Sequence, residues 1–239
     1  MKKWHRNIIV AVLVILILLC ILYIANIFMN YDNGRKVYDD IKEVAKGDNK
    51  VYSLDGDNLS QVEYMGVNLT LSKNINKDIV SWIYIPDSRI DYPIVKGIDN
   101  EKYLNTLVDG SEGMNGTIFI DSRIEDYDRN LVIYGHNMKD GSMFHDLRNY
   151  EDAEWRSNHK TVYLSMEDYS PKKYKVIHVS EVRSNDEIYE ILLNNDIRAY
   201  DWLKKNGSVE EYDNKKSLIG LSTCKGTGDI RILVLIQEL

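Results

Sequence analysis

The sequence predicts a mainly β domain, an eight-stranded barrel or sandwich with helical additions, joined to an N-terminal membrane helix. Two observations predict these two parts. A long apolar run without charge near the N-terminus predicts the membrane helix, and eight short runs rich in β-forming residues after Ser81 predict the β domain. A third observation limits the fold class. Few of the eight runs are separated by a helical segment, whereas a doubly wound α/β fold needs a helix between most strands.

The apolar run covers residues 8–29 and contains no charged side chain. At about 1.5 Å of rise per residue, a helix of this length spans the roughly 30 Å hydrocarbon core of a membrane. Lys2, Lys3 and Arg6 precede it, so the positive-inside rule places the N-terminus in the cytoplasm and the rest outside. The run is longer than the apolar region of a cleaved signal peptide, and no small-x-small site follows it. We therefore expect a retained signal-anchor.

Between the membrane segment and the β-rich part, the sequence predicts short helices and a loop. Val37 and Ile41 recur at helical spacing in 34–46, the polar stretch 47–60 is typical of a loop, and 76–81 favours a short helix. The expected organisation is a cytoplasmic N-terminus (1–7), a transmembrane segment (8–29), a helix with a linker (30–73) and a catalytic domain (74–239).

The β-forming runs end at turn-forming residues, as strands do. Between the sixth and seventh runs, residues 186–205 carry apolar side chains at near-helical spacing and predict an insert of one or two helices. The eight expected strands are 82–85, 90–95, 117–120, 131–134, 161–164, 174–182, 217–222 and 230–236.

The charge excludes one class of partner. The chain has a net charge of −7 at pH 7, and the part beyond the membrane segment is more acidic because the basic N-terminal tail is left behind. Nucleic acid is not expected as a partner, since its binding depends on neutralising phosphates. No Cys/His spacing typical of zinc and no EF-hand pattern occurs, so we expect neither a metal nor a cofactor.

Candidate chemistry lies at the ends of three predicted strands. Cys224 is the one cysteine outside the membrane segment, so no second thiol is present to pair with it in a disulfide. His136 follows the strand that ends in Tyr134-Gly135, and Arg231 opens the last strand. A thiolate is a good nucleophile, imidazole can protonate a leaving amine, and a guanidinium is a fixed cationic donor for an oxyanion.

Each of these residues also has a structural interpretation. Free cysteine is among the most buried residue types, a histidine after a glycine can cap a turn, and an arginine can form a surface ion pair. His145 and His178 are alternative partners for the thiol on spacing alone. The three structural interpretations are weaker together, because all three residues fall at strand ends.

Several motifs together resemble one known family, the sortases, and within it class B. Residues 221–224, Leu-Ser-Thr-Cys, are similar to the sortase Leu-x-Thr-Cys signature, and Arg231 stands in the position of the family arginine. The segment around His136 resembles the class B histidine segment. The resemblance covers about 74–239 and includes the segments 82–85, 90–97, 116–121 and 130–144.

The resemblance implies an eight-stranded sortase β-barrel, with the helical insert between strands six and seven that is typical of class B. It also implies a membrane-anchored cysteine transpeptidase on the outer face of a Gram-positive cell. Such an enzyme cleaves a C-terminal sorting motif of a secreted protein after Thr and joins the protein to a peptidoglycan amine. Cys224 would be the nucleophile, His136 the acid and base, and Arg231 the cationic stabiliser, with Ser222 and Thr223 lining the substrate groove.

One feature departs from the family pattern. Six residues separate Cys224 from Arg231, which is short for the family, and their glycines favour a compact hairpin. Lys225, next to the thiol, is a candidate for tuning its reactivity or steering substrate. Two other functions remain open: a cell-surface cysteine protease or hydrolase that uses the same residues, and an anchored binding domain whose Cys224 is merely buried.

Overall fold

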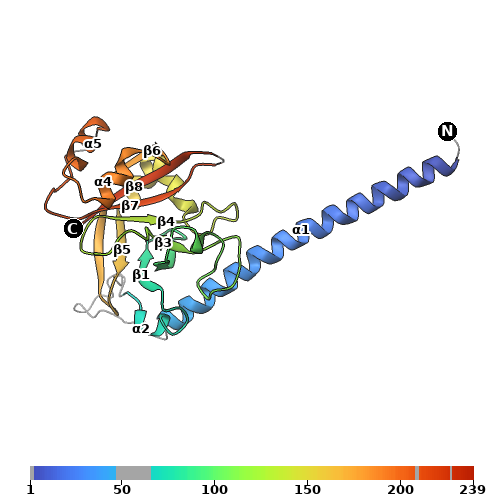
Figure 1. The fold of residues 1–239 in the computed structure, drawn as a ribbon, viewed down its shortest axis with the longest axis horizontal. Helices are drawn as coiled ribbons and strands as arrows, with labels where there is room; N and C mark the ends of the chain where they lie inside the picture. Colours follow the sequence, from blue (N-terminus) through green and yellow to red (C-terminus); the bar gives the residue numbers. More distant parts are fainter. Residues whose placement is uncertain (1–2, 47–65, 208–209, 227) are drawn as a thin grey trace, which may run out of the picture.

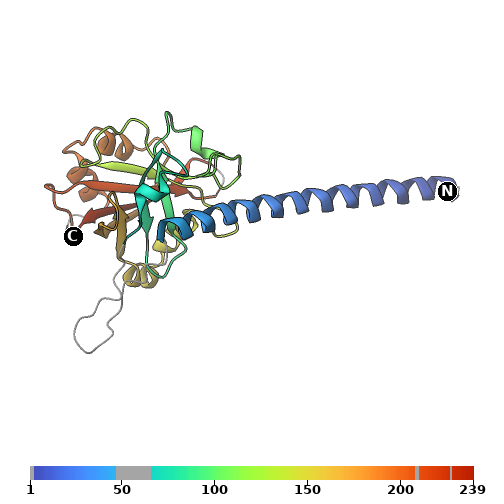
Figure 2. The same ribbon diagram turned by 90° about the horizontal axis from the view of Figure 1, so that it is seen from below.

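The N-terminal helix is a single element that reaches from the apolar run to the barrel. The computed structural model describes residues 3–46, 66–207, 210–226 and 228–239, and in it α1 runs without a break over Lys3–Lys46. Figures 1 and 2 show its first part projecting away from the barrel and its last turns lying against it. Tyr38, Ile41 and Ala45 are buried there at helical spacing.

The separate helix expected over 34–46 is therefore wrong in its start, because it continues the apolar helix. Gly34 does not interrupt α1. It is buried where the helix passes Asn115, and the close approach favours a glycine because a side chain here would meet the Asn115 amide. The expected loop 47–60 lies outside the described residues. The helix expected over 76–81 is also wrong, because the β-branched pair Ile79-Val80 begins the first strand instead.

The strands form a closed barrel in the order β1-β2-β3-β4-β7-β8-β6-β5. Two neighbouring pairs are parallel, β2 with β3 and β4 with β7, and the other pairs are antiparallel. The prediction of eight strands and a mainly β barrel is confirmed. The strands are β1 (Ile79–Tyr84), β2 (Asp91–Val95), β3 (Ile118–Ile120), β4 (Leu131–Tyr134), β5 (Thr161–Ser165), β6 (Pro171–Arg183), β7 (Leu218–Cys224) and β8 (Ile230–Glu238).

Among the described residues, the helices that follow β1 lie in the connections between strands, whereas α1 and α2 precede it. The insert between β6 and β7 consists of two helices, which confirms its prediction (Figure 1). Four other short helices of the described residues were not expected, because one or two turns carry too little periodicity to stand out in a sequence. The helices beyond α1 are α2 (Leu69–Ser72), η1 (Lys102–Leu104), η2 (His145–Glu151), α3 (Ala153–Asn158), α4 (Glu187–Leu193) and α5 (Ala199–Lys205).

Two apolar clusters hold these elements together. One fills the barrel and includes the α1 residues that reach it, and the other joins α4 and α5 to β7 and β8. Gly220 of β7 permits the second contact, since a Cβ there would lie 2.9 Å from Leu192 Cδ1. The close approach places α4 against β7, four residues before Cys224.

Candidate active site

Cys224 and Arg231 lie directly opposite each other on adjacent antiparallel strands. Cys224 ends β7, and its register partner on β8 is Arg231. Lys225 N donates to Ile230 O at 2.9 Å, so backbone pairing continues one step into the hairpin. Side chains of opposite residues in such a pair point to the same face, with Cβ atoms about 4.5–5.5 Å apart. The short connection, which includes Thr227 outside the described residues, therefore keeps Arg231 beside the thiol.

The guanidinium of Arg231 rests on the hairpin. Its Nη1 donates to Gly228 O at 2.7 Å and to Ile230 O at 3.2 Å. Nε and Nη2 make no hydrogen bond within the described parts of the chain, so they remain available to a ligand. Lys225 is oriented differently, because its ammonium is paired with Glu151 and Glu181. Two carboxylates therefore compensate the positive charge of Lys225, the residue expected to tune Cys224 or to steer substrate.

His136 follows β4 and is held by a backbone carbonyl from another loop. Its Nε2 lies 2.7 Å from Leu104 O, and because a carbonyl only accepts, Nε2 must carry the proton in this contact. Gly135 brings the chain close to Phe144, where a Cβ would lie 2.7 Å from the ring. Asn137 Nδ2 donates to Cys224 O at 2.8 Å. The histidine loop is thus tied to the strand that bears the thiol.

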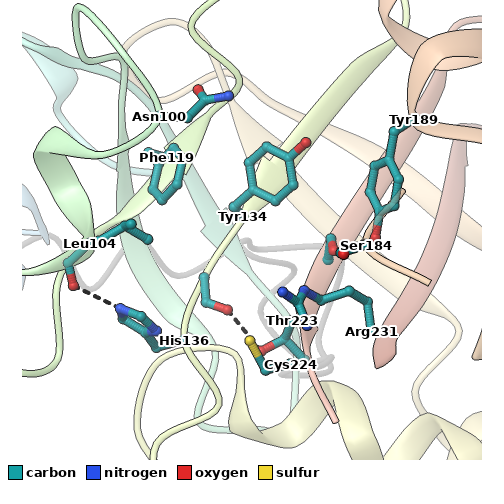
Figure 3. Close-up of a pocket in the computed structure, with 12 residues that line it drawn as sticks. Asn100, Leu104, Phe119, Tyr134, His136, Ser184, Tyr189, Thr223, Cys224 and Arg231 are labelled. Atoms are coloured by element: carbon teal, nitrogen blue, oxygen red, sulfur yellow. Dashed lines mark hydrogen bonds between the residues drawn. The ribbon is translucent and has the colours of Figure 1, made fainter. Parts of the chain in front are cut away.

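All three side chains line one cavity of about 280 Å³. Figure 3 shows His136 on one side of the cavity, with Cys224 and Arg231 across from it. Cys224 is partly exposed rather than enclosed in the core, which disfavours its interpretation as a buried structural thiol. The lining residues are Asn100, Leu104, Phe119, Tyr134, Gly135, His136, Ser184, Tyr189, Ser222, Thr223, Cys224 and Arg231.

Alternation along the strands explains most of this lining. Phe119, Tyr134 and Ser222 are register neighbours across β3, β4 and β7, and Cys224 lies two residues after Ser222 on the same face. The ring centroids of Phe119 and Tyr134 are 5.4 Å apart, and those of Tyr134 and Tyr189 are 6.2 Å apart. These rings form an aromatic wall that continues from the sheet onto α4.

Ser222 and Thr223 line the cavity, but their hydroxyls are engaged inside the protein. Ser222 Oγ lies 2.8 Å from Tyr189 Oη, and Thr223 Oγ1 donates to Gly135 O at 2.7 Å. Burial raises the pKa of Tyr189, while the Ser222 hydrogen bond and the charge of Arg231 lower it in part. Tyr189 therefore stays a neutral phenol at physiological pH.

Asp121 forms hydrogen bonds with two residues that line the cavity, Asn100 and Tyr134. Its carboxylate has no exposed surface and accepts hydrogen bonds from Arg123, Asn100 Nδ2 at 3.0 Å and Tyr134 Oη at 3.1 Å. Arg123 also donates to Glu190 on α4, at 3.1 Å. Burial and the Asp121 charge raise the pKa of Tyr134, so its hydroxyl remains a donor. The network joins the loop before β3 to the strand and the helix that form the aromatic wall.

Comparison with known proteins assigns the chain to a family. The sortase domain model matches residues 83–236, which is more than half of the chain. The chain belongs to the sortase family. It is 38% identical over 135 residues to sortase B of Listeria monocytogenes, a match that covers 55% of this chain and 52% of that protein. It is 27% identical over 161 residues to sortase B of Staphylococcus aureus, covering 64% and 66% respectively.

The solved structure of Clostridium perfringens sortase B is similar to this chain with a TM-score of 0.64 and 27% sequence identity. That match covers 72% of this chain and all of the other. The assignment to class B is therefore shown by sequence and by fold. The two sequence matches span about half and about two thirds of the relatives' own lengths.

The structure separates the sortase cavity from the other histidines that the sequence offered. His145 begins η2 and His178 lies within β6, and neither lines the cavity. Within the described residues, no group of three or more His, Cys, Asp or Glu side chains gathers as a metal site would.

Several groups that line or support the cavity were not predicted from the sequence. Leu104 contributes a backbone carbonyl, for which no side-chain signal exists. Asp121 and Asn100 lie in loops, and the sequence does not show that they meet. Tyr134 could have been found from the sequence. It is the last residue of its predicted strand and directly precedes Gly135-His136, so it had to lie close to the candidate histidine.

Proposed function

We propose that this class B sortase is a cysteine transpeptidase that cleaves a sorting motif after Thr and transfers the protein to a peptidoglycan amine. One observation carries the proposal: Cys224 and Arg231 are register partners at the end of one hairpin, and His136 lines the same cavity. A nucleophile, a proton carrier and a fixed cation are the groups that acyl transfer through a thioester requires.

In the proposed reaction, the Cys224 thiolate attacks the Thr carbonyl and forms a tetrahedral oxyanion. Arg231 is the cationic donor for that oxyanion through its free N–H groups. The C–N bond then breaks, and the departing amine takes a proton from the His136 imidazolium, which leaves a thioester on Cys224. An incoming amine attacks the thioester, gives its proton to His136 and releases the thiolate, so the enzyme returns to its starting state.

Ser222 and Thr223 are proposed to shape the groove from below, since their hydroxyls are used within the protein. Tyr134, Tyr189 and Phe119 offer an apolar wall for the residues of the motif that precede the Thr. The proposed partners are secreted proteins that bear a sorting motif and an amine of a peptidoglycan precursor or cross-bridge.

We further propose that the sortase is anchored in the cell membrane with its N-terminus in the cytoplasm. Helix α1 is long and apolar enough to cross a membrane, and its apolar stretch is not covered by the rest of the described protein. The proposed segments are 1–7 inside, 8–29 in the membrane, 30–73 as a helix and linker, and 74–239 as the catalytic domain outside. The basic residues before the apolar run support this orientation.

The test incubates the full chain in detergent with a peptide library randomised around a central Thr, together with triglycine as acceptor. Mass spectrometry should detect peptides cleaved after Thr and joined to triglycine, and Cys224→Ala should form none. If saturating triglycine yields only hydrolysed peptide, the protein is a cysteine hydrolase. If a small alkylating reagent modifies Cys224 only after unfolding and no peptide is cleaved, the protein is a binding module.

A further inference from the structure

The β2–β3 connection holds His136 in place through the backbone carbonyl of Leu104. Within this connection, the segment around Gly116 packs against the backbone of Leu104. Gly116, near its end, has a φ of +56°, and a Cβ there would lie 2.5 Å from Leu104 O. Thr117 N donates to Tyr103 O at 2.9 Å. The carbonyl that accepts from His136 is therefore in direct contact with the backbone of Gly116.

Helix α1 reaches the same connection from the other side. Tyr38 is 3% exposed, and its hydroxyl donates to Gly116 O and lies 3.0 Å from Thr117 Oγ1. Its ring meets Tyr92 edge to face, with centroids 5.3 Å apart. One turn earlier, Gly34 packs against the Asn115 side chain. The contacts of α1 therefore fall on Gly116, which supports the Leu104 carbonyl, and on the residues directly before and after it.

We propose that Tyr38 is a positioning residue for the imidazole, and that docking of α1 places the Leu104 carbonyl and through it His136. The inference rests on the proposed function, because it gives the anchor helix a role in the chemistry assigned to His136. A direct series of contacts carries it: the Tyr38 hydroxyl holds the Gly116 carbonyl, Gly116 packs on the Leu104 carbonyl, and that carbonyl accepts the Nε2 proton.

The Nε2 contact has a chemical consequence. When Leu104 O holds the proton on Nε2, the neutral ring presents Nδ1 as its basic nitrogen. If the carbonyl moves away, both tautomers become populated and the ring gains rotational freedom. Since proton transfer depends on the geometry of the donor and acceptor, kcat should fall while the affinity for the peptide is retained.

The experiment compares three variants of the full chain in detergent. Tyr38→Phe removes the hydroxyl, and Gly34→Ala presses on Asn115 while favouring the helix. Lys46→Gln is the matched control, because it removes a 2.6 Å ion pair between α1 and Asp91 of β2, away from the β2–β3 connection. The readouts are kcat and KM for the ligated product, and the ¹⁵N chemical shifts of the His136 ring nitrogens.

Tyr38→Phe is expected to lower kcat about tenfold with KM little changed, and to shift the His136 ring nitrogens from the Nε2–H tautomer towards a mixture. Gly34→Ala should act in the same direction, and Lys46→Gln should leave the ring nitrogens as in the unmodified chain. Unchanged ring nitrogens in Tyr38→Phe and Gly34→Ala, or an equal change in Lys46→Gln, overturn the inference. Absence of ligation by the unmodified chain counts against the proposed function instead, because the ring signals are read without substrate.

Discussion

The two sides of the cavity are built by different means. Cys224 and Arg231 are placed by the register of β7 and β8, and that hairpin continues a regular pairing that begins at Leu218. His136 lies beyond the end of β4 and is placed by a hydrogen bond to Leu104, in a connection that belongs to no strand. The nucleophile side follows from sheet geometry, whereas the histidine side depends on loop contacts between segments far apart in the sequence.

This difference indicates how substitutions on each side should affect activity. A change on the hairpin side acts on chemistry at a rigid position, because a barrel strand is paired on both edges. A substitution on the histidine side can move His136, because several loop contacts together determine the position of its ring. Activity on the two sides should therefore respond to different substitutions, with different effects on stability.

The largest effect is expected from Arg231→Ala. Loss of a preorganised cationic donor for an oxyanion lowers kcat about 10²–10³-fold, and no buried contact is removed, so thermal stability should change little. Arg231→Lys is the matched comparison, since it keeps the charge but lacks the planar set of donors. Steady-state kinetics on the library peptide measure both, and an Arg231→Ala enzyme within threefold of the parent would remove Arg231 from the proposed mechanism.

Asp121→Asn should reduce stability more than it reduces chemistry. Asp121 accepts hydrogen bonds from Arg123, Asn100 and Tyr134 without surface exposure, and leaving such donors badly matched costs about 2 kcal/mol. Chemical denaturation of the full chain at pH 7 measures the loss. A KM that rises with little change in kcat would place the effect on the aromatic wall rather than on Cys224.

The pH dependence of this loss has a definite sign. Burial raises the pKa of Asp121, but hydrogen bonds and charge from Arg123, with help from Asn100, outweigh it and hold the pKa below its ordinary value of 3.8. The carboxylate thus stabilises the fold above pH 3.8, and this contribution disappears as the pH falls through the lower folded value. The gap between Asp121→Asn and the parent should be constant from pH 7 to about 4 and should narrow below it. A gap that widens on acidification contradicts this account.

Asn137→Ala tests whether the two sides are coupled directly. The Asn137 amide donates to Cys224 O, and losing one hydrogen bond of this kind costs about 1 kcal/mol. We expect kcat to fall several-fold, since the histidine loop loses its tie to the thiol strand. Asn158→Ala, in the last turn of α3, is the matched control because Asn158 lies outside the cavity. An equal effect of the two substitutions would show that the tie is not used.

The strand side of the cavity could be predicted from the sequence, whereas the loop side could not. The eight strands and the positions of Cys224, His136 and Arg231 at strand ends were predicted, because alternation and turn residues are local signals. The helix expected over 76–81 was wrong, since the apolar side chains near Ile79 fit both helical and strand spacing until pairing with β2 decides.

The contacts that complete the cavity were out of reach for a physical reason. The Leu104 carbonyl, the Gly116 turn and the Tyr38 hydroxyl meet through three segments whose mutual position depends on barrel closure. Backbone carbonyls are the same in every residue, so no pattern of side chains marks the one that accepts from His136. The merging of 34–46 into α1 was similarly hidden, because Gly34 ordinarily favours a helix end and here is accommodated by Asn115.

The smallest effect is expected at His178, which lies on β6 away from both sides of the cavity. Burial lowers its pKa from the ordinary 6.5, and the charge of Arg156 lowers it further. The ring packs edge to face on Trp202, and within the described residues its Nε2 has no hydrogen-bond partner. The folded protein therefore resists protonation of this ring more than the unfolded chain does.

The sign of the resulting pH effect is opposite to that of a histidine stabilised by an acid. As the pH falls below 6.5, the unfolded chain binds the proton first and stability declines, by at most about 1.4 kcal/mol per pH unit, until the folded value is reached. His178→Phe keeps the ring contact with Trp202 and should remove this decline, which denaturation curves at pH 7 and pH 5 will measure. Its kcat at pH 7 should match the parent. A marked loss of kcat would restore His178 as a candidate partner of the thiol, and with it a site that neither side of the cavity accounts for.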